Sequence, residues 1–487
     1  MLFNSFEFIF VFLPISFGIY FFLCGKEYFS ASKWWIVFSS LFFYSWWNIF
    51  YLPIILTSIS FNYFLGKFLI KEKFRQKRLM LLISGILANI FLLGYFKYKN
   101  FLIDNINTAF DFNIYSVDIA LPLAISFFTF QQIAYLVDAY QQKVKKQNFL
   151  NYAVFITFFP QLIAGPIVHH SEMMPQFDDH DKKTKNYHNI AKGMFIFSIG
   201  LYKKVVIADT FSVWASAGFD NSNILTFYEA WATSLSYTFQ LYFDFSGYAD
   251  MAIGLALLFN IYLPVNFNSP YKALNIQDFW RRWHLTLSRF LREYVYIPLG
   301  GNRKGEVRTY KNLMATFVIG GLWHGAGWTF ILWGALHGLA IIVHRAWSRL
   351  GVQCWRWLAW FMTFNFINIT WVFFRANNLS DAMMVLKGML GLSGIYVKDV
   401  TLTGLLKLEV ATLKLIPFFT NSSRLNIAVL LLVSILSLPL IFFKNSHDIS
   451  IEIQSVSKYL FFMIVLFLTS ILFMNSFSES EFLYFDF

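Results

Sequence analysis

The feature that most constrains this chain is a series of long apolar runs separated by short clusters of lysine and arginine. A membrane-spanning helix needs about 20 largely apolar residues, and many of the runs approach that length. Only 14% of the residues are charged, against roughly 25% in soluble domains. The chain is therefore predicted to be an all-α, polytopic integral membrane protein.

The apolar runs predict roughly 11 to 14 membrane segments, some of them re-entrant where glycine or proline interrupts the run. No internal repeat and no soluble domain breaks the pattern, so residues 1–487 are expected to form a single membrane domain. The candidate segments are Phe6–Leu23, Trp34–Phe50, Leu52–Ile70, Leu79–Phe96, Leu121–Tyr140, Tyr152–Val168, Ile190–Ala208, Ala230–Phe243, Ala249–Ile261, Leu313–His344, Trp357–Phe374, Ile427–Phe443 and Tyr459–Phe473.

The basic clusters predict which face of the membrane each loop occupies, because cytoplasmic loops carry an excess of lysine and arginine. The net charge of +12 is accordingly interpreted as an orientation signal and not as a nucleic-acid-binding surface. The N-terminus, the loop Lys99–Ala120 and the acid-rich segment Glu172–Asp181 are then expected outside. The clusters assigned to the inner face comprise Lys71, Lys73, Arg75, Lys77, Arg78, Lys143, Lys145, Lys146, Arg281, Arg282, Arg289, Arg292, Arg303, Lys304, Arg308, Lys311, Arg345, Arg349 and Arg356.

Histidines within the stretch Asp278–Leu339 are the strongest functional signal, because ionisable groups at membrane depth are costly and are by default functional. His324 lies in GGLWHGAGW, whose small residues indicate a broken or closely packed helix. A buried, neutral imidazole there could accept a proton from a hydroxyl or a thiol. The alternative is a structural histidine that bonds a carbonyl of a neighbouring helix.

His284 lies in FWRRWHLTLS, within a dense cluster of arginine and tryptophan. Guanidinium groups suit the bidentate binding of phosphates, so this patch is a candidate binding site for a phosphate-bearing substrate that donates a chemical group. The alternative is a helix anchored at the membrane interface by its Trp and Arg side chains. The candidate donor-binding residues are Trp280, Arg281, Arg282, Trp283 and Arg289.

Two carboxylates occur inside the apolar run Tyr242–Ala256. Asp244 and Asp250 could carry protons or ions, as in a transporter, but a structural role in capping a helix broken near Ser246–Gly247 is favoured. The prolines and the glycine of Phe158–Val168 predict a second interrupted helix.

The remaining histidines and the cysteines do not predict a metal site. His337 and His344 share a helical face, but no carboxylate or thiolate accompanies them at ligand spacing. The two cysteines, Cys24 and Cys354, form no zinc-binding motif. The pair His169–His170 is expected in a solvated loop.

Long motifs in a fixed order resemble the membrane-bound O-acyltransferase superfamily. The resemblance is to the branch that contains alginate and peptidoglycan O-acetylation proteins and D-alanyl transfer proteins. It covers nearly the whole chain and rests on LPLAISFFTFQQIAYLVD, FFPQLIAGPI, YFDFSGYADMAIGLALLFNIYLPVNFNSPY, FWRRWHLTLSRFLREYVYIPLGGNRKG and GGLWHGAGWTFILWGALHG.

The resemblance implies that His324, in the WHG motif, is the catalytic histidine of the superfamily. It implies that His284, in the RWH motif, is the second active-site residue. It also implies a helical fold with a thinned centre, in which a funnel or tunnel connects the two membrane faces.

The function expected from this resemblance is O-acetylation of an extracytoplasmic polysaccharide by a multi-pass protein of the bacterial inner membrane. Acetyl-CoA is the expected donor, no cofactor is expected to stay bound, and a periplasmic SGNH-type acetyltransferase is the expected partner besides membrane lipids. An alginate-like exopolysaccharide is the first expectation for the acceptor, with peptidoglycan or cellulose as alternatives. A secondary transporter is disfavoured, since transporters often show inverted repeats and this chain shows none.

Overall fold

The computed structural model describes residues 1–117, 119–144, 148–352, 354–395, 445–446, 448–449, 456–476 and 481–483. These residues form helices and connecting segments without a β-strand, as the sequence predicted. The predicted span Ile427–Phe443 lies outside the described residues, as do Asp118, Lys145 and Lys146.

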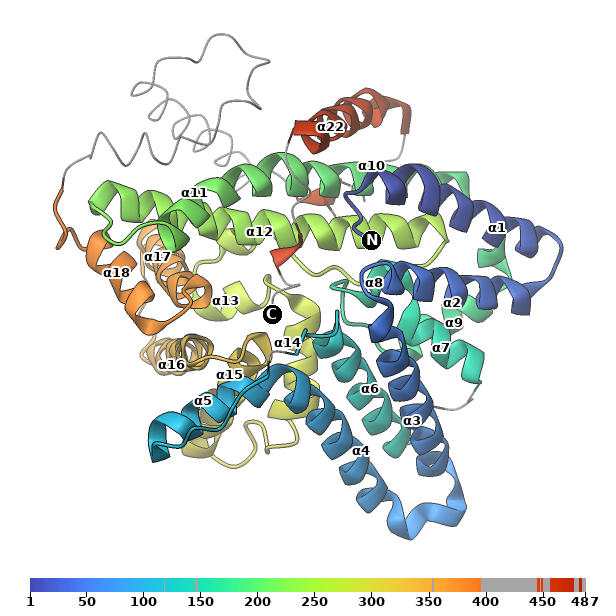
Figure 1. Ribbon diagram of the computed structural model, residues 1–487, viewed down its shortest axis with the longest axis horizontal. Coiled ribbons are helices and arrows are strands. Elements are labelled where there is room, and N and C mark those ends of the chain that lie inside the picture. Colours follow the sequence, from blue (N-terminus) through green and yellow to red (C-terminus); the bar gives the residue numbers. More distant parts are fainter. Residues whose placement is uncertain are drawn as a thin grey trace.

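Figure 1 shows the arrangement of the helices, whose bounds are as follows. The first half of the chain forms α1 (Leu13–Gly25), α2 (Phe29–Ser45), α3 (Leu52–Ile70), α4 (Arg78–Leu93), α5 (Lys99–Phe110), α6 (Ile125–Tyr140), α7 (Phe149–Thr157), α8 (Phe159–Leu162), α9 (His170–Asp178), α10 (Tyr187–Tyr202) and α11 (Asp209–Asp220). The second half forms α12 (Phe227–Leu258), α13 (Ile276–Trp280), α14 (Leu285–Leu291), α15 (Glu306–His324), α16 (Trp328–Arg349), α17 (Arg356–Arg375), α18 (Leu379–Met389) and α22 (Val456–Ser476). Short 3-10 or π segments are η1 (Phe8–Phe12), η2 (Ile49–Tyr51), η3 (Glu72–Lys77), η4 (Gly94–Tyr98), η5 (Asp181–Lys183), η6 (Lys203–Ala208), η7 (Pro270–Lys272) and η8 (Arg292–Tyr296).

The long helix α12 runs through the middle of the protein, with α10 and α11 along one side of it (Figure 1). A capping box at its start, in which Thr226 and Glu229 satisfy each other's backbone N–H groups, fixes where the helix begins. Glycines on both helices bring α10 and α12 into backbone contact. A Cβ atom on Gly200 would lie 2.6 Å from the carbonyl oxygen of Gly247, and one on Gly254 would lie 2.6 Å from that of Gly193. Only residues without a side chain permit this distance.

The predicted break near Ser246–Gly247 is wrong, because α12 continues without interruption through both residues. Gly247 serves the close approach of α10 rather than a turn. The two carboxylates of this run are neutralised by lysines of η6. Asp244 lies 2.8 Å from the ammonium of Lys204, and Asp250 lies 2.7 Å from that of Lys203. These buried ion pairs give both carboxylates the structural role that was favoured, in a continuous helix instead of a broken one.

The interrupted helix predicted at Phe158–Val168 is confirmed. α7 ends at Thr157, α8 is a single turn that begins with Pro160 at its second position, and residues 163–169 have no regular structure. This irregular backbone is buried against α12 and α14, where protein groups can pair with it.

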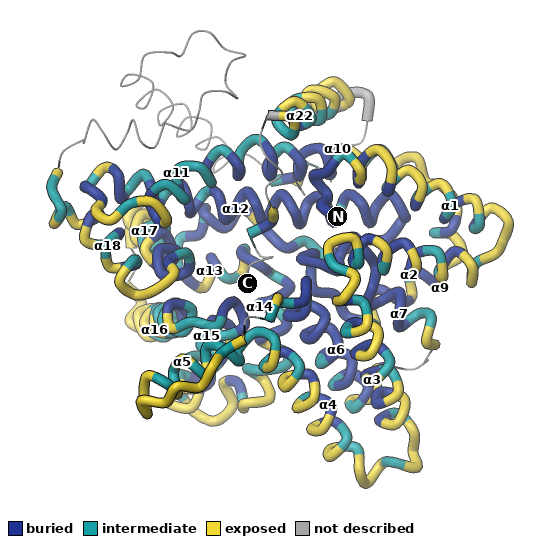
Figure 2. Tube along the Cα trace, in the orientation of Figure 1, coloured by how far each residue is buried: buried dark blue, intermediate teal, exposed yellow. Residues whose placement is uncertain are grey.

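Five helical stretches within the described residues are long and apolar enough to cross a membrane: Phe8–Gly25, Ile49–Ile70, Glu72–Phe110, Trp328–Arg349 and Arg356–Arg375. Figure 2 shows that burial is concentrated along α12 and around α14, whereas the outer faces of α1, α4 and α22 are exposed. Large apolar side chains occupy those outer faces, for example Phe91 at 74% exposure and Phe22 at 63%. Such a surface suits contact with lipid.

The acid-rich segment Glu172–Asp181 contacts an arginine of the basic clusters that were assigned to the opposite face. Its Glu172 carboxylate forms a bidentate ion pair with Arg289, at 2.8 and 3.0 Å, and Asp178 lies 2.5 Å from the ammonium of Lys33. Partial burial would raise the pKa of Asp178, but the hydrogen bond and charge of Lys33 lower it below its ordinary value. Arg289 was assigned to the inner face and the acid-rich segment to the outer face, so this ion pair shows that the two share one face and that the two assignments do not both hold.

Labelling of single cysteines introduced into a Cys354→Ser background decides which face the segment occupies, and the inner face is expected because Arg289 belongs to the largest basic cluster. Asp181→Cys should react with a membrane-impermeant thiol reagent only after spheroplasts are permeabilised, in the same way as Lys73→Cys in the inner cluster. Tyr115→Cys, whose native side chain is 86% exposed in the loop after α5, should react in intact spheroplasts. Labelling of Asp181→Cys together with Tyr115→Cys would place the segment on the outer face instead.

Candidate active site

His324 is the last residue of α15, and its position follows from the glycines around it. Gly325 and Gly327 are extended, so the chain leaves the helix directly after the histidine. A Cβ atom on Gly325 would lie 2.1 Å from the ring of Phe330, and one on Gly321 would lie 2.3 Å from the Phe330 carbonyl oxygen. The predicted broken segment is thus confirmed, with the break immediately after His324.

The His324 ring lies in a cage of aromatic side chains and is only 3% exposed. The centroids of Trp323, Trp333 and Phe374 lie 4.9, 5.1 and 5.1 Å from the imidazole centroid, all edge-on. A cavity of about 660 Å³ lies next to this cage, lined by Gly325 and Phe374 among others. Its walls include the residues after His324, residues of η4 and the end of α17. The tunnel across the membrane stays a prediction.

His284 lies beside the same indole as His324. It precedes α14 in a left-handed conformation, with φ +43°, and its ring is fully buried. The His284 centroid is 6.2 Å from that of Trp323 and 4.8 Å from that of Phe245. Its Nδ1 atom lies 3.0 Å from Oδ1 of Asn266. The fold therefore brings both sequence-predicted histidines into contact with the Trp323 indole, although they are 40 positions apart in the sequence.

The five residues of the predicted donor-binding patch do not stay together. Trp283 is buried in the aromatic core against Phe279 and Trp371. The Trp280 indole N–H donates to Nδ1 of His337 at 3.1 Å. The patch separates because α13 is short and ends in a turn, so that consecutive side chains point to different surroundings.

The arginines of the patch differ in their pairing. Arg282 is paired with Asp278 at 2.8 Å, and Arg289 is held by Glu172. Arg281 is exposed, and its side chain forms no hydrogen bond or ion pair with the described part of the chain. Arg281 is thus the arginine of this patch that is free to bind a ligand.

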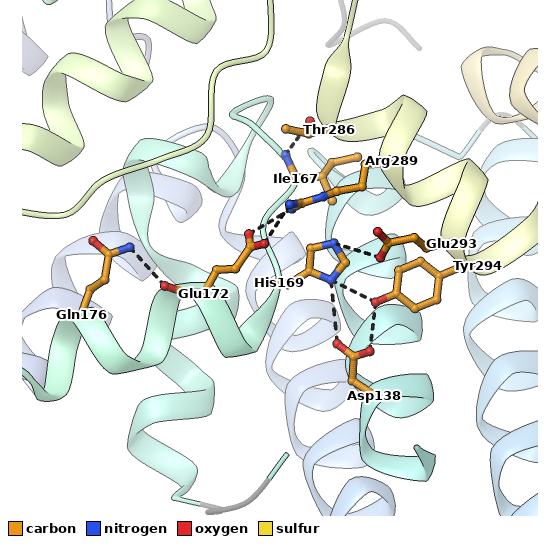
Figure 3. Close-up of polar contacts among 9 residues, drawn as sticks. All are labelled: Asp138, Ile167, His169, Glu172, Gln176, Thr286, Arg289, Glu293 and Tyr294. Atoms are coloured by element: carbon orange, nitrogen blue, oxygen red, sulfur yellow. Dashed lines mark hydrogen bonds and ion pairs between the residues drawn. The ribbon is translucent and has the colours of Figure 1, made fainter. Parts of the chain in front are cut away.

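A polar cluster next to α14 and η8 includes His169 (Figure 3). His169 was expected in a solvated loop, but it is 7% exposed, which corrects that expectation. The Tyr294 hydroxyl lies 3.0 Å from Nδ1 of His169 and donates to Asp138 at 3.1 Å, while Glu293 lies 4.0 Å from Nε2. These groups satisfy one another where the irregular segment 163–169 meets α6 and η8.

Sequence reasoning missed Lys97, which anchors the helix end that carries His324. The ammonium of Lys97 donates to the carbonyl oxygens of Trp323 at 2.6 Å and His324 at 3.1 Å. The neighbouring Tyr98 hydroxyl donates to the carbonyl of Leu322 at 2.5 Å. A helix leaves its last carbonyls without partners inside the helix, and a cation there is favoured by the helix dipole. Lys97 ends an apolar run, so its sequence position resembles that of an ordinary interface lysine.

Two buried imidazoles beside one indole, next to a cavity and at the end of a glycine-broken helix, define a site suited to proton transfer from a hydroxyl or thiol. The comparison with known proteins agrees with this class. The chain belongs to the membrane-bound O-acyltransferase family, whose family model matches residues 41–380. It is an O-acyltransferase.

Individual relatives cover most of the chain. It is 55% identical over 427 residues to a peptidoglycan O-acetyltransferase of Helicobacter pylori, covering 81% of each chain. It is 39% identical over 428 residues to a probable alginate O-acetylase of Pseudomonas aeruginosa, covering 85% of this chain and 80% of the relative. A teichoic acid D-alanyltransferase of Bacillus subtilis is 27% identical over 252 residues, covering 48% of this chain and 62% of that protein.

Replacing Lys97 by Met should impair the site without removing either histidine. Met preserves much of the side-chain length, but it leaves the carbonyls of Trp323 and His324 without their donor, at a cost of about 1–3 kcal/mol. A displacement of His324 by ~1 Å would lower turnover on the order of 10²-fold. Thermal unfolding in detergent and acetyl transfer measure the two effects. Lys387→Met, an exposed lysine on α18, is the matched control, and equal activity of both variants would contradict the anchoring role.

Proposed function

We propose that this protein acetylates peptidoglycan, moving the acetyl group from a cytosolic thioester to an acceptor on the outer side of the bacterial inner membrane. The observation that carries the proposal is the 55% identity to a peptidoglycan O-acetyltransferase across 81% of both chains, against 39% for the probable alginate O-acetylase. Peptidoglycan therefore replaces the alginate-like polymer as the favoured acceptor.

His324 is proposed as the general base. It removes the proton of the acceptor hydroxyl as the hydroxyl oxygen attacks the thioester carbonyl, so that a C–O bond forms and the C–S bond breaks. The proton then passes to the departing thiolate, which leaves as a free thiol. The glycine break after His324 supports this role, because it places the ring at the end of α15 beside the cavity. Positioned acid–base groups contribute about 10²–10⁴-fold to such a step.

Acetyl-CoA is the proposed donor, reaching the site from the inner face. The support is Arg281, an exposed arginine close in sequence to His284 on the surface assigned to the cytosol. Guanidinium groups bind phosphates well, and the donor carries phosphates. The donor is a substrate in this scheme, and no resident cofactor is required.

The acceptor side of the proposal includes a periplasmic SGNH-type acetyltransferase as partner, as the family resemblance implies. The cavity beside His324 supports access for an acceptor group, since its lining includes polar side chains such as Asn100 and Gln240. The location in the inner membrane and the multi-pass topology belong to the same proposal. They are supported by the five apolar helices long enough to cross a bilayer.

Replacing either proposed active-site histidine should lower acetylation while the protein still inserts. His324→Ala should lower acetylation about 10²–10⁴-fold, and His284→Ala should also impair it. The measurement is base-labile acetate released from purified peptidoglycan of a deletion strain complemented with each variant. His344→Gln is the control, because His344 is only partly buried, near the end of α16.

The same strains decide between acceptors. Acetate lost from peptidoglycan alone supports the proposal, whereas acetate lost from an exopolysaccharide with peptidoglycan unchanged would assign the acceptor to the alginate type. Full acetylation by a well-expressed His324→Ala protein would contradict the catalytic role itself.

The two arginines that flank His284 should behave differently. Arg281→Ala should raise the KM for acetyl-CoA with little change in thermal stability, since the side chain contacts solvent. Arg289→Ala should lower stability instead, because it leaves the Glu172 carboxylate without its partner. Steady-state kinetics and unfolding of both purified variants test this, and an unchanged KM for Arg281→Ala would return that residue to a topological role.

A further inference from the structure

The side chain of Asn266 contacts the Nδ1 atom of the His284 ring. Asn266 lies in the segment between α12 and η7, is 1% exposed, and its Oδ1 atom faces three hydrogen-bonding atoms. These atoms are Nδ1 of His284 at 3.0 Å, the backbone nitrogen of Thr286 at 3.3 Å and the Thr286 hydroxyl at 3.0 Å.

The orientation of the Asn266 amide follows from its partners. The backbone N–H of Thr286 lies in the first turn of α14, where it has no partner within the helix, and it can only donate. The amide atom that faces it must therefore be the oxygen. The Thr286 hydroxyl agrees, because it accepts a hydrogen bond from the Ile167 N–H at 3.0 Å and so directs its own hydrogen to Asn266.

The protonation of the His284 ring then follows. A carboxamide oxygen accepts hydrogen bonds and cannot donate, so the Nδ1 atom 3.0 Å away must carry the hydrogen. A neutral imidazole carries one hydrogen, which leaves Nε2 with a lone pair. Nε2 is buried and has no hydrogen-bond partner within the described residues, so no group of the described chain occupies its lone pair.

The backbone supports the same arrangement. His284 has a left-handed conformation, with φ +43°, that residues with a side chain rarely adopt. Two main-chain hydrogen bonds flank it: Leu285 N–H donates to the Asn266 carbonyl at 3.0 Å, and Asn268 N–H donates to the Arg282 carbonyl at 2.9 Å. The segment that supplies Asn266 thus also fixes the backbone from which the His284 ring projects.

We propose that Asn266 is a positioning residue that holds His284 in the Nδ1–H tautomer, so that Nε2 serves only as a proton or hydrogen-bond acceptor during acyl transfer. The proposal rests on the proposed function in assigning His284 to the reaction. It adds a direction for the proton: the hydrogen at Nε2 comes from a reactant or from protonated His324, and never from neutral His284.

The first test is independent of the substrate. The protein is labelled with ¹⁵N-histidine, and the His284 signals are identified by their loss in His284→Gln. Nitrogen shifts of the full-length protein in bilayers should show a protonated Nδ1 and an unprotonated Nε2. A wild-type His284 signal with the hydrogen on Nε2 would overturn the proposal.

The second test uses variants of Asn266. Asn266→Leu removes the acceptor at similar volume and should lower kcat about 10- to 100-fold, with the KM for acetyl-CoA little changed. Asn266→Asp keeps an acceptor oxygen, and its kcat should be about tenfold higher than that of Asn266→Leu. The control is Asn89→Leu, which breaks a buried amide pair with Asn62 between α3 and α4 and should lower stability without a selective loss of kcat.

The outcomes separate this inference from the proposed function. If wild-type protein leaves peptidoglycan unacetylated, the proposed acceptor is wrong, and the nitrogen shifts still decide the tautomer. Equal kcat for Asn266→Leu and wild type would contradict the positioning role. Equal losses in Asn266→Leu and Asn266→Asp, with the Nδ1–H signal retained in both, would also contradict it.

Discussion

The site depends on the requirement that every backbone polar group at membrane depth has a partner. α15 ends inside the protein, so the carbonyls of Leu322, Trp323 and His324 need donors that water does not supply. Lys97 and Tyr98, two neighbours on η4, provide them. The helix can therefore stop at the histidine, and the glycines that follow can border a cavity instead of continuing a spanning segment. The interruption of the helix thus places the histidine at the helix end, next to the residues that line the cavity.

Close packing holds the end of α15 in its position. Trp333 and Trp371 are fully buried and stacked with centroids 5.7 Å apart, and the His324 ring packs edge-on against Trp333. Glycine contacts bring α16 against α15, as they bring α10 against α12. In a bilayer, helix association relies on such packing and on internal hydrogen bonds. The aromatic content of the chain thus forms the rigid wall of the site, and lipid contact accounts for only part of it.

Buried charges in this protein are paired within the scaffold. Asp244 and Asp250, which in another context would suggest an ion pathway, are each paired with a lysine of η6. Lys204 also lies 2.9 Å from Asp209, so one cation serves two carboxylates. Removing one partner of such a pair leaves an uncompensated charge in a low dielectric, which is strongly destabilising. The pairing therefore gives these two carboxylates of an apolar run a structural role.

The sequence alone determined the membrane class, the helical fold and the family, because each depends on local composition or on a continuous motif. His324 and its glycines are adjacent in the chain, so their shared role could be predicted from GGLWHGAGW. The tertiary structure decided which groups support the histidines. Lys97 lies 227 positions from His324, and Asn266 lies 18 from His284 across an irregular loop, so no periodicity connects them. The same reason separates Arg281 from Trp283: neighbours in sequence face solvent and core once a short helix ends in a turn, and only the folded chain determines which faces which.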